Sequence, residues 1–143
     1  MNITTIVDTD RLFSEEAFSI YAPCMYQPTY EAYRTLIKGF VSNPSIKVFV
    51  REVHGAIIGI LVLRRVGAAI EIVGIAVSAA YRHRGIGRAM IHDVMASEHL
   101  ECVKAETDDD AVGFYRKCGS SVERIIKEYP DGIAVRYRCT LRR

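Results

Sequence analysis

The chain has 143 residues, of which 50% are hydrophobic and 25% charged, and its formal net charge is +2. This size and composition predict one soluble domain, residues 1–143, with a single core. The small net charge, with Lys and Arg spread along the chain, argues against a nucleic-acid partner. Because no apolar run approaches the ~20 residues of a membrane span and the N-terminus lacks a signal-peptide layout, we expect a cytoplasmic protein with no membrane partner.

The cysteines and histidines show no metal-binding pattern. The four cysteines form no CxxC pair and the four histidines form no HExxH motif. We therefore expect neither a metal site nor a disulfide framework. Cys118 has no histidine beside it in the sequence, which favours a small apolar residue near a helix end over an acyl-carrying nucleophile.

The first part of the chain predicts a strand and two helices. Residues 2–7 alternate weakly, as in a strand, and an acidic residue after them begins a helix that runs to about Ile20. Two prolines then interrupt the chain, and a second helix begins at Thr29 or Gln27. Tyr26 and Tyr30 belong to the aromatic-rich elbow between the helices, which either lines an acceptor pocket or packs the two helices together.

The rest of the chain predicts more strands than helices. Strands are expected at residues 46–53, 56–63, 69–77, 101–107, 122–129 and 133–141, with one helix ending near residue 99 and another at residues 111–118. The helix between the fourth and fifth strands implies a parallel crossover, whereas the short turns elsewhere imply antiparallel pairs. The order β-α-α-β-β-β-α-β-α-β-β predicts an α+β fold with a mixed, mostly antiparallel sheet.

One stretch carries the chemistry. The apolar strand that ends at Val77 is followed by a basic, glycine-containing turn and then by a helical pattern. Gly85 and Gly87 lack Cβ atoms where the backbone has to approach a ligand, and the helix start offers free N–H groups, so the turn predicts a phosphate or diphosphate site. Gly74, inside the strand, marks a bulge or a close approach of another group.

Two motifs in this order resemble the GNAT superfamily of acyl-CoA-dependent N-acetyltransferases. The first is Arg82-His-Arg-Gly85-Ile-Gly87, and the second is Ala111-Val-Gly-Phe114-Tyr115-Arg-Lys117-Cys-Gly119, where Ser120 then replaces the family's usual phenylalanine. The resemblance implies a single-domain GNAT-like fold, in which the fourth and fifth strands splay apart, and acetyl-CoA as cosubstrate.

The resemblance also implies a cofactor-binding set. The backbone of the fourth strand is expected to pair with pantetheine, the basic turn to cradle the diphosphate, and two later residues to complete the site. These residues are Ile75, Ala76 and Val77; Arg82, His83, Arg84, Gly85, Ile86, Gly87 and Arg88; and Asp108 and Tyr115. Asp108 stands where the family usually has asparagine and lacks its amide donor, so capping of the next helix is an alternative.

Glu71 and Tyr115 are the candidate catalytic residues. Glu71 is a carboxylate in an otherwise apolar strand, and histone acetyltransferases of the superfamily carry their catalytic glutamate in a similar Glu-Ile-Val context. It is a candidate general base and lies beside the acceptor; the alternative is a solvent-facing residue paired with Arg64 or Arg65. The family uses the tyrosine at Tyr115 as general acid toward the departing thiolate, and the alternative there is core packing.

We therefore predict acetyl transfer from acetyl-CoA to a primary amine of a small molecule or a peptide, by direct attack in a ternary complex. Tyr26, Tyr30 and Glu71 are the expected acceptor-binding residues. A CoA-binding regulatory or sensor module without catalysis is the alternative. A P-loop or Rossmann nucleotide domain is disfavoured, because no Gly-Lys-Ser/Thr follows Gly87. The closing hairpin, with residues 135–141 as an exposed edge, suggests a homodimer.

Overall fold

The computed structural model describes residues 4–6 and 8–143. Its elements follow the predicted order, and among these residues the strands form one seven-stranded sheet, β1-β2-β3-β4-β5-β7-β6, in which β4 and β5 pair in parallel and the other neighbours pair antiparallel. The strands are β1 (Thr4–Ile6), β2 (Ile46–Val53), β3 (Ala56–Val66), β4 (Ala69–Val77), β5 (Cys102–Thr107), β6 (Ser121–Tyr129) and β7 (Gly132–Arg142). The helices are α1 (Glu15–Tyr21), α2 (Tyr30–Ser42), α3 (Ile86–Ser97) and α4 (Val112–Lys117).

Capping side chains set the starts of the first two helices. The helix predicted to follow the first strand is divided into a 3₁₀ turn, Thr9–Leu12, and α1, because the Ser14 hydroxyl accepts the Ala17 N–H and starts the helix there. The Thr29 hydroxyl accepts the Ala32 N–H in the same way at the start of α2, as the sequence predicted. Of the first expected strand, residues 2, 3 and 7 lie outside the described residues.

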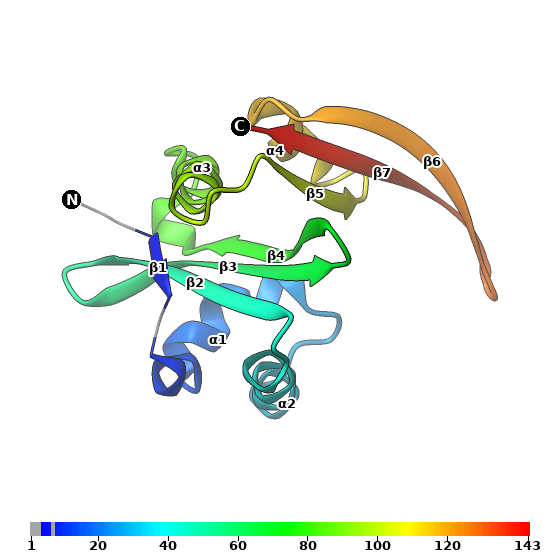
Figure 1. Ribbon diagram of the computed structural model, residues 1–143. Helices are drawn as coiled ribbons and strands as arrows, with labels where there is room; N and C mark the ends of the chain where they lie inside the picture. The colour runs from blue at the N-terminus through cyan, green and yellow to red at the C-terminus, as the bar shows by residue number, and fades with distance from the viewer. Residues whose placement is uncertain (1–3, 7) are drawn as a thin grey trace.

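The sheet is covered on both faces. Helices α1 and α2 lie on one face and α3 and α4 on the other (Figure 1). On the first face Tyr33 and Ile37 of α2 are fully buried, and on the second Met90 and Val94 of α3 are at most 1% exposed. Apolar residues that recur every three or four positions thus place one stripe of each helix in a core.

Strand β4 contains a bulge at Val73, which has no partner on β3 between Ile72 and Gly74. Ile72 and Ile75, three residues apart, both pack into the core beneath α3, which the extra residue makes possible. Glu71 and Gly74 therefore share the opposite face, toward α1 and α2. The bulge that the sequence predicted around Gly74 is present and reorients Glu71.

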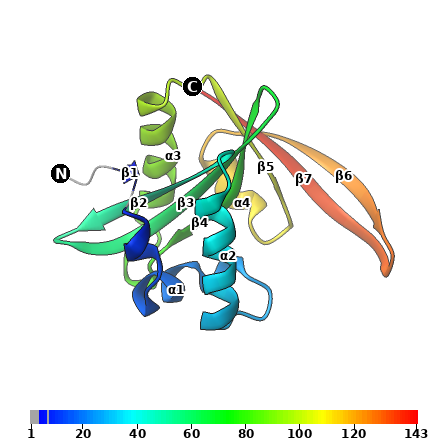
Figure 2. The ribbon, with the colours of Figure 1, turned by 60° about the horizontal axis from the view of Figure 1, so that its bottom comes forward.

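Strands β4 and β5 splay apart as expected. Their pairing in the described chain is limited to Glu71 with Lys104, near the start of each strand. On its other side β5 pairs with β7 along its whole length, and beyond Lys104 the two parallel strands diverge (Figure 2). One edge of β4 is thereby left open along its second half.

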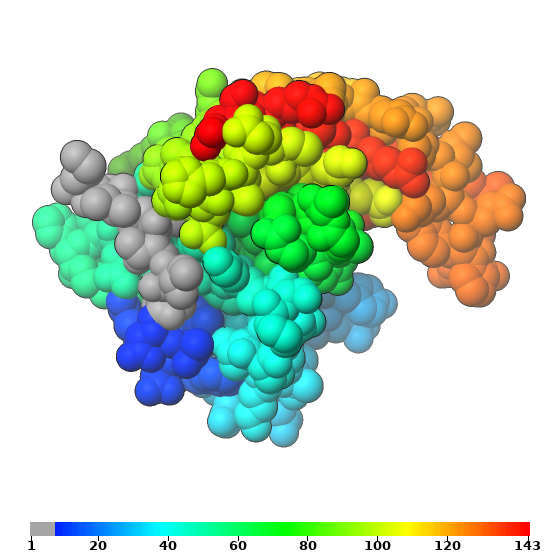
Figure 3. All heavy atoms as spheres, viewed as in Figure 1, coloured from blue at the N-terminus to red at the C-terminus, as the bar shows by residue number. Residues whose placement is uncertain are grey.

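The closing hairpin, β6 and β7, projects beyond the rest of the molecule (Figure 3). Ile126 and Ile133 on it are 62% and 71% exposed. The outer edge of the sheet is β6, and not residues 135–141 as the sequence analysis expected, because β7 lies between β5 and β6. None of the described helices has the length and apolar character needed to cross a membrane.

Candidate active site

The open edge of β4 presents two residues to the gap between the splayed strands. The Ser78 N–H donates to the Ile58 carbonyl at 2.7 Å. Because residues of an antiparallel pair face their partner strand alternately, Ala76 points its backbone groups to β3, and Ile75 and Val77 point theirs away from it. The backbone of β4 thus offers donors and acceptors in the arrangement that an added strand uses.

Two side chains already contact these outward carbonyls. The Cys24 thiol donates to the Ile75 carbonyl at 3.3 Å, and the Arg82 Nε–H donates to the Val77 carbonyl at 3.0 Å. Both interactions confirm that the carbonyls face the gap. Arg82 therefore ties the basic turn to the end of β4.

The start of α3 forms an anion site next to this edge. Gly85 is the N-cap, at φ +75°, and no side chain caps the helix. The first intrahelical bond runs from the Ala89 N–H to the Gly85 carbonyl at 3.0 Å, so the amides of residues 86–88 have no intrahelical acceptor. Arg82, His83, Arg84 and Arg88 are exposed around it. Free amides and positive charge together suit a diphosphate.

Gly87 has a packing role, and the approach to a ligand that its motif suggested stays a prediction. A Cβ there would lie 2.9 Å from Cε1 of Phe114. The missing side chain therefore admits the ring of α4 against α3, and Gly87 is buried. Gly85, with no atom within 4 Å of an added Cβ, is instead required by its positive φ.

Tyr115 and Tyr21 lie near Cys24, whose thiol contacts the Ile75 carbonyl. Burial raises the pKa of the Tyr115 phenol, and the nearby thiols of Cys139 and Cys24 raise it further. Burial likewise raises the pKa of Tyr21, with Cys24 again contributing. Both phenols therefore stay protonated near neutral pH. Tyr115, at 7% exposure, also packs into the core as the alternative interpretation held.

Tyr21, one of the aromatic residues of the elbow, makes a contact that the sequence did not predict. A Cβ at Gly74 would lie 2.0 Å from the Tyr21 hydroxyl oxygen, so the glycine lets this phenol reach the backbone of β4. Gly74 signalled a close approach in the sequence. Nothing local indicated that the approaching group comes from α1, more than fifty positions earlier.

Glu71 is less buried than its apolar strand suggested. Its side chain is 37% exposed, and its Oε2 accepts from Nη2 of Arg64, directly across the β3–β4 ladder, at 3.0 Å. The alternative contact named from the sequence is therefore formed. The desolvation argument for Glu71 does not apply at this exposure, and its role as a base stays a prediction.

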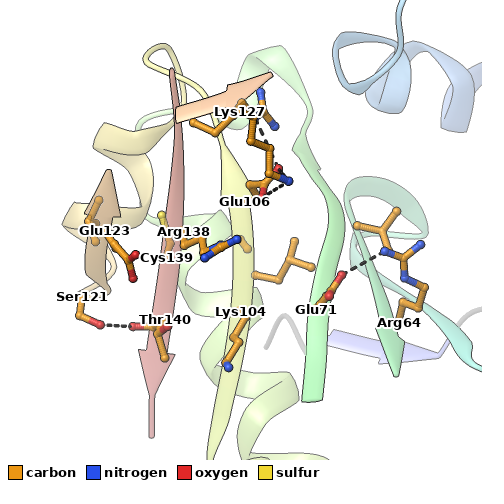
Figure 4. A pocket seen from close by; sticks show the side chains of 15 residues that line it. Arg64, Glu71, Lys104, Glu106, Ser121, Glu123, Lys127, Arg138, Cys139 and Thr140 are labelled. Carbon is orange, nitrogen blue, oxygen red and sulfur yellow. Dashed lines mark hydrogen bonds and ion pairs between the residues drawn. The ribbon is translucent and has the colours of Figure 1, made fainter. Parts of the chain in front are cut away.

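Glu71 lines a cavity of about 870 Å³ on the face of the sheet formed by β4, β5, β7 and β6 (Figure 4). Val73, at the bulge, also lines it, two residues before Ile75. The cavity therefore begins close to the open edge of β4. Most of its other lining residues are charged.

The aromatic elbow packs the two helices together. Tyr30 stacks on Tyr33 with ring centroids 6.3 Å apart, and Phe18 approaches the Tyr30 ring edge-on at 5.8 Å. Tyr26 is 89% exposed. Neither Tyr26 nor Tyr30 lines the cavity that contains Glu71. Their contribution to acceptor binding stays a prediction.

Asp108 is engaged by its own turn. Its Oδ1 accepts the N–H groups of Asp110 and Ala111 at 3.1 and 3.0 Å, ahead of α4. This matches the capping alternative. At the other end of α4, Gly119 takes φ +92° after the helix, as predicted. Within residues 4–6 and 8–143, no cluster of His, Cys, Asp or Glu is arranged to hold a metal ion.

Known proteins share this architecture. Residues 10–120 match the model of the acetyltransferase (GNAT) family. The ribosomal-protein-S18-alanine N-acetyltransferase of Escherichia coli superposes with a TM-score of 0.69 at 17% identity, over 99% of this chain and 94% of that one. A variant of the spermidine N-acetyltransferase of Vibrio cholerae gives 0.70 at 15% identity, over 99% and 93%.

A Bacillus anthracis protein solved with acetyl coenzyme A gives a TM-score of 0.60 at 21% identity, over 74% of this chain and 67% of that one. Identities this low show a shared fold and no more. No curated protein sequence matches the chain. The family model, together with this fold, identifies an acyl-CoA-dependent N-acyltransferase. The chain belongs to the GNAT family of acetyltransferases, since the family model matches most of its length.

Proposed function

We propose that this protein transfers the acetyl group of acetyl-CoA to a primary amine by direct attack in a ternary complex. One observation carries the proposal: the outward backbone groups of Ile75 and Val77 lie next to the uncapped start of α3. The backbone groups can pair with the amides of pantetheine, and the start of α3 can bind a diphosphate. The residues present thus fit acetyl-CoA, which supplies the acetyl thioester.

Glu71 is the proposed general base. An alkylammonium group with a pKa near ~10 is not a nucleophile until it loses a proton. Glu71 lines the cavity that begins near Ile75, and the Val73 bulge turns it to the face of Gly74 and Tyr21. It would accept the proton through water.

Tyr115 is the proposed general acid. Its raised pKa keeps the phenol protonated, so it has a proton for the thiolate that leaves as the new amide bond forms. A backbone N–H of β4, near Val77, would donate to the carbonyl oxygen of the acetyl group. The outward direction of Ile75 and Val77 supports this placement.

Thiol release from acetyl-CoA tests these roles with a panel of primary amines. Glu71→Gln and Tyr115→Phe should each lower kcat by about 100-fold or more, with CoA binding retained. Arg64→Gln breaks the same ion pair as Glu71→Gln but keeps the carboxylate, so its loss should be far smaller. If both catalytic variants turn over like the wild type, the assignment fails.

The same assay separates this proposal from the alternative, a CoA-binding sensor without catalysis. Acetyl-CoA would then raise the melting temperature while no amine on the panel releases thiol. The fold alone does not select the acceptor, because the similar structures include an enzyme named for a protein amine and another named for spermidine.

A further inference from the structure

The cavity that contains Glu71 carries an excess of positive charge. Five basic residues line it: Arg64, Lys104, Lys127, Arg136 and Arg138. Only three acidic residues do so: Glu71, Glu106 and Glu123. Because the whole chain has a net charge of only +2, this imbalance is local to the cavity.

The carboxylates of the cavity are largely committed. Glu71 pairs with Arg64, as described above. Glu106 pairs with Lys127 at 2.8 Å and with Arg136 at 3.6 Å. The Lys127 hydrogen bond, with the charges of Lys127, Arg136 and Arg138, holds the pKa of Glu106 below its usual value, so this carboxylate is already shared among several cations.

Lys104 and Arg138 can still bind a ligand, although the charge of Arg138 also acts on Glu106. Within the described part of the chain, neither makes an ion pair, although Glu106 and Glu123 both lie opposite Arg138 in the ladders. Lys104 of β5 is paired with Thr140 of β7, so Arg138 is its diagonal neighbour on the same face. Diagonal neighbours stand roughly 7–8 Å apart, a spacing that lets two long cationic side chains converge on one carboxylate.

These cations also stand beside the proposed base. Lys104 is the residue that pairs with Glu71 where β4 and β5 meet. Figure 4 shows Lys104 and Arg138 on neighbouring strands, with Glu71 on the next strand along. A molecule whose carboxylate is bound by these cations can therefore extend toward β4 and Glu71.

We propose that the acceptor is a primary amine that carries a carboxylate, which Lys104 and Arg138 bind while the amine lies near Glu71. This inference rests on the proposed acetyl transfer. A polyamine is the opposite chemistry, since its positive charges would meet a cavity with five cations and three carboxylates. The carboxylate can belong to a small amino acid or to a peptide with an acidic residue near its N-terminus.

The test compares acceptors that differ only in charge. β-Alanine is paired with β-alaninamide, a short peptide with glutamate at its second position is paired with its glutamine counterpart, and spermidine is included. The acid of one pair should have a kcat/KM at least about tenfold above that of its amide, as expected for a charge-assisted contact. The pair that shows this preference identifies the source. Preference for the amides or for spermidine would overturn the inference.

Binding of the reaction product gives a readout that does not need turnover. Calorimetry with CoA present should show N-acetyl-β-alanine, or the acetylated acidic peptide, binding about tenfold more tightly than its amide. Lys104→Met and Arg138→Gln should abolish that preference, whereas Lys38→Gln, on the exposed side of α2, should keep it. Equal binding of acid and amide overturns this inference alone, while a failure to bind CoA at all overturns the proposed function.

Discussion

Adding a methyl group at Gly74 tests how closely Tyr21 is packed against β4. The new Cβ would lie 2.0 Å from the hydroxyl oxygen of Tyr21 and 2.8 Å from its Cζ. The ring is 2% exposed and meets Phe40 edge-on at 6.3 Å between centroids. Because a tyrosine has only two side-chain torsions, it cannot withdraw without loosening the packing of α1 against α2.

The free-energy change follows from two opposing effects. Overpacking of a buried site costs about 1–3 kcal/mol. The lower backbone entropy of unfolded alanine returns about 0.4–1 kcal/mol. Gly74→Ala should therefore reduce the free energy of unfolding by roughly 1–2 kcal/mol, which lowers the melting temperature of a domain of this size by about 2–8 °C. Urea denaturation followed by circular dichroism measures the loss.

Gly113→Ala is the matched control, because no atom lies within 4 Å of a Cβ at that position in α4. It should stabilise the protein by up to about 1 kcal/mol. Combining Gly74→Ala with Tyr21→Phe removes the hydroxyl contact, so the double variant should lose less than the sum of the two single losses. Wild-type stability of Gly74→Ala, or strict additivity in the double variant, would refute the packing argument.

Three further changes have defined outcomes. Gly87→Ala should reduce the free energy of unfolding in urea by roughly 1–2 kcal/mol, because its methyl meets the Phe114 ring at 2.9 Å and the gain from alanine offsets only part of that cost; unchanged stability would contradict the contact. Glu106→Gln should lower the free energy of unfolding near pH 7, since the pKa of this carboxyl is depressed in the folded protein. Its difference from wild type should shrink as the pH falls from the ordinary pKa of 4.5 through the lower folded pKa. A difference that stays constant in urea denaturation across this pH range would argue against the Lys127 contact. In the wild-type enzyme, kcat should begin to fall at alkaline pH only above the ordinary tyrosine pKa of 10.0, because the Tyr115 phenol keeps its proton up to that pH. A fall in kcat well below pH 10 would oppose the role of Tyr115 as the acid.

The order of elements was predictable because its determinants are local. Alternating apolar residues, the prolines of the elbow and the turn before β7 set element limits to within a few residues. The splay of β4 from β5 came from the family resemblance, and the structure accounts for it by a single paired position. The turn at Gly85 was likewise predictable from a local feature, since a glycine there permits the positive φ.

What the sequence did not predict depends on contacts between distant residues. Tyr21 reaches β4 only because α1 folds under the sheet, and the pairing of Glu71 with Arg64 depends on the register of β3 against β4. The packing of Gly87 against Phe114 was not predicted for the same reason, as Phe114 is far away along the chain. The charged cavity combines residues from five strands, whose shared face follows from the ladder registers.

The most direct measurement is a crystal structure of the protein with CoA. The account predicts that pantetheine lies along the open edge of β4, hydrogen-bonded to the backbone of Ile75 and Val77, with the diphosphate at the amides that begin α3. The thiol should then lie near Tyr115. A CoA molecule bound elsewhere, with the gap between β4 and β5 left empty, would contradict the account.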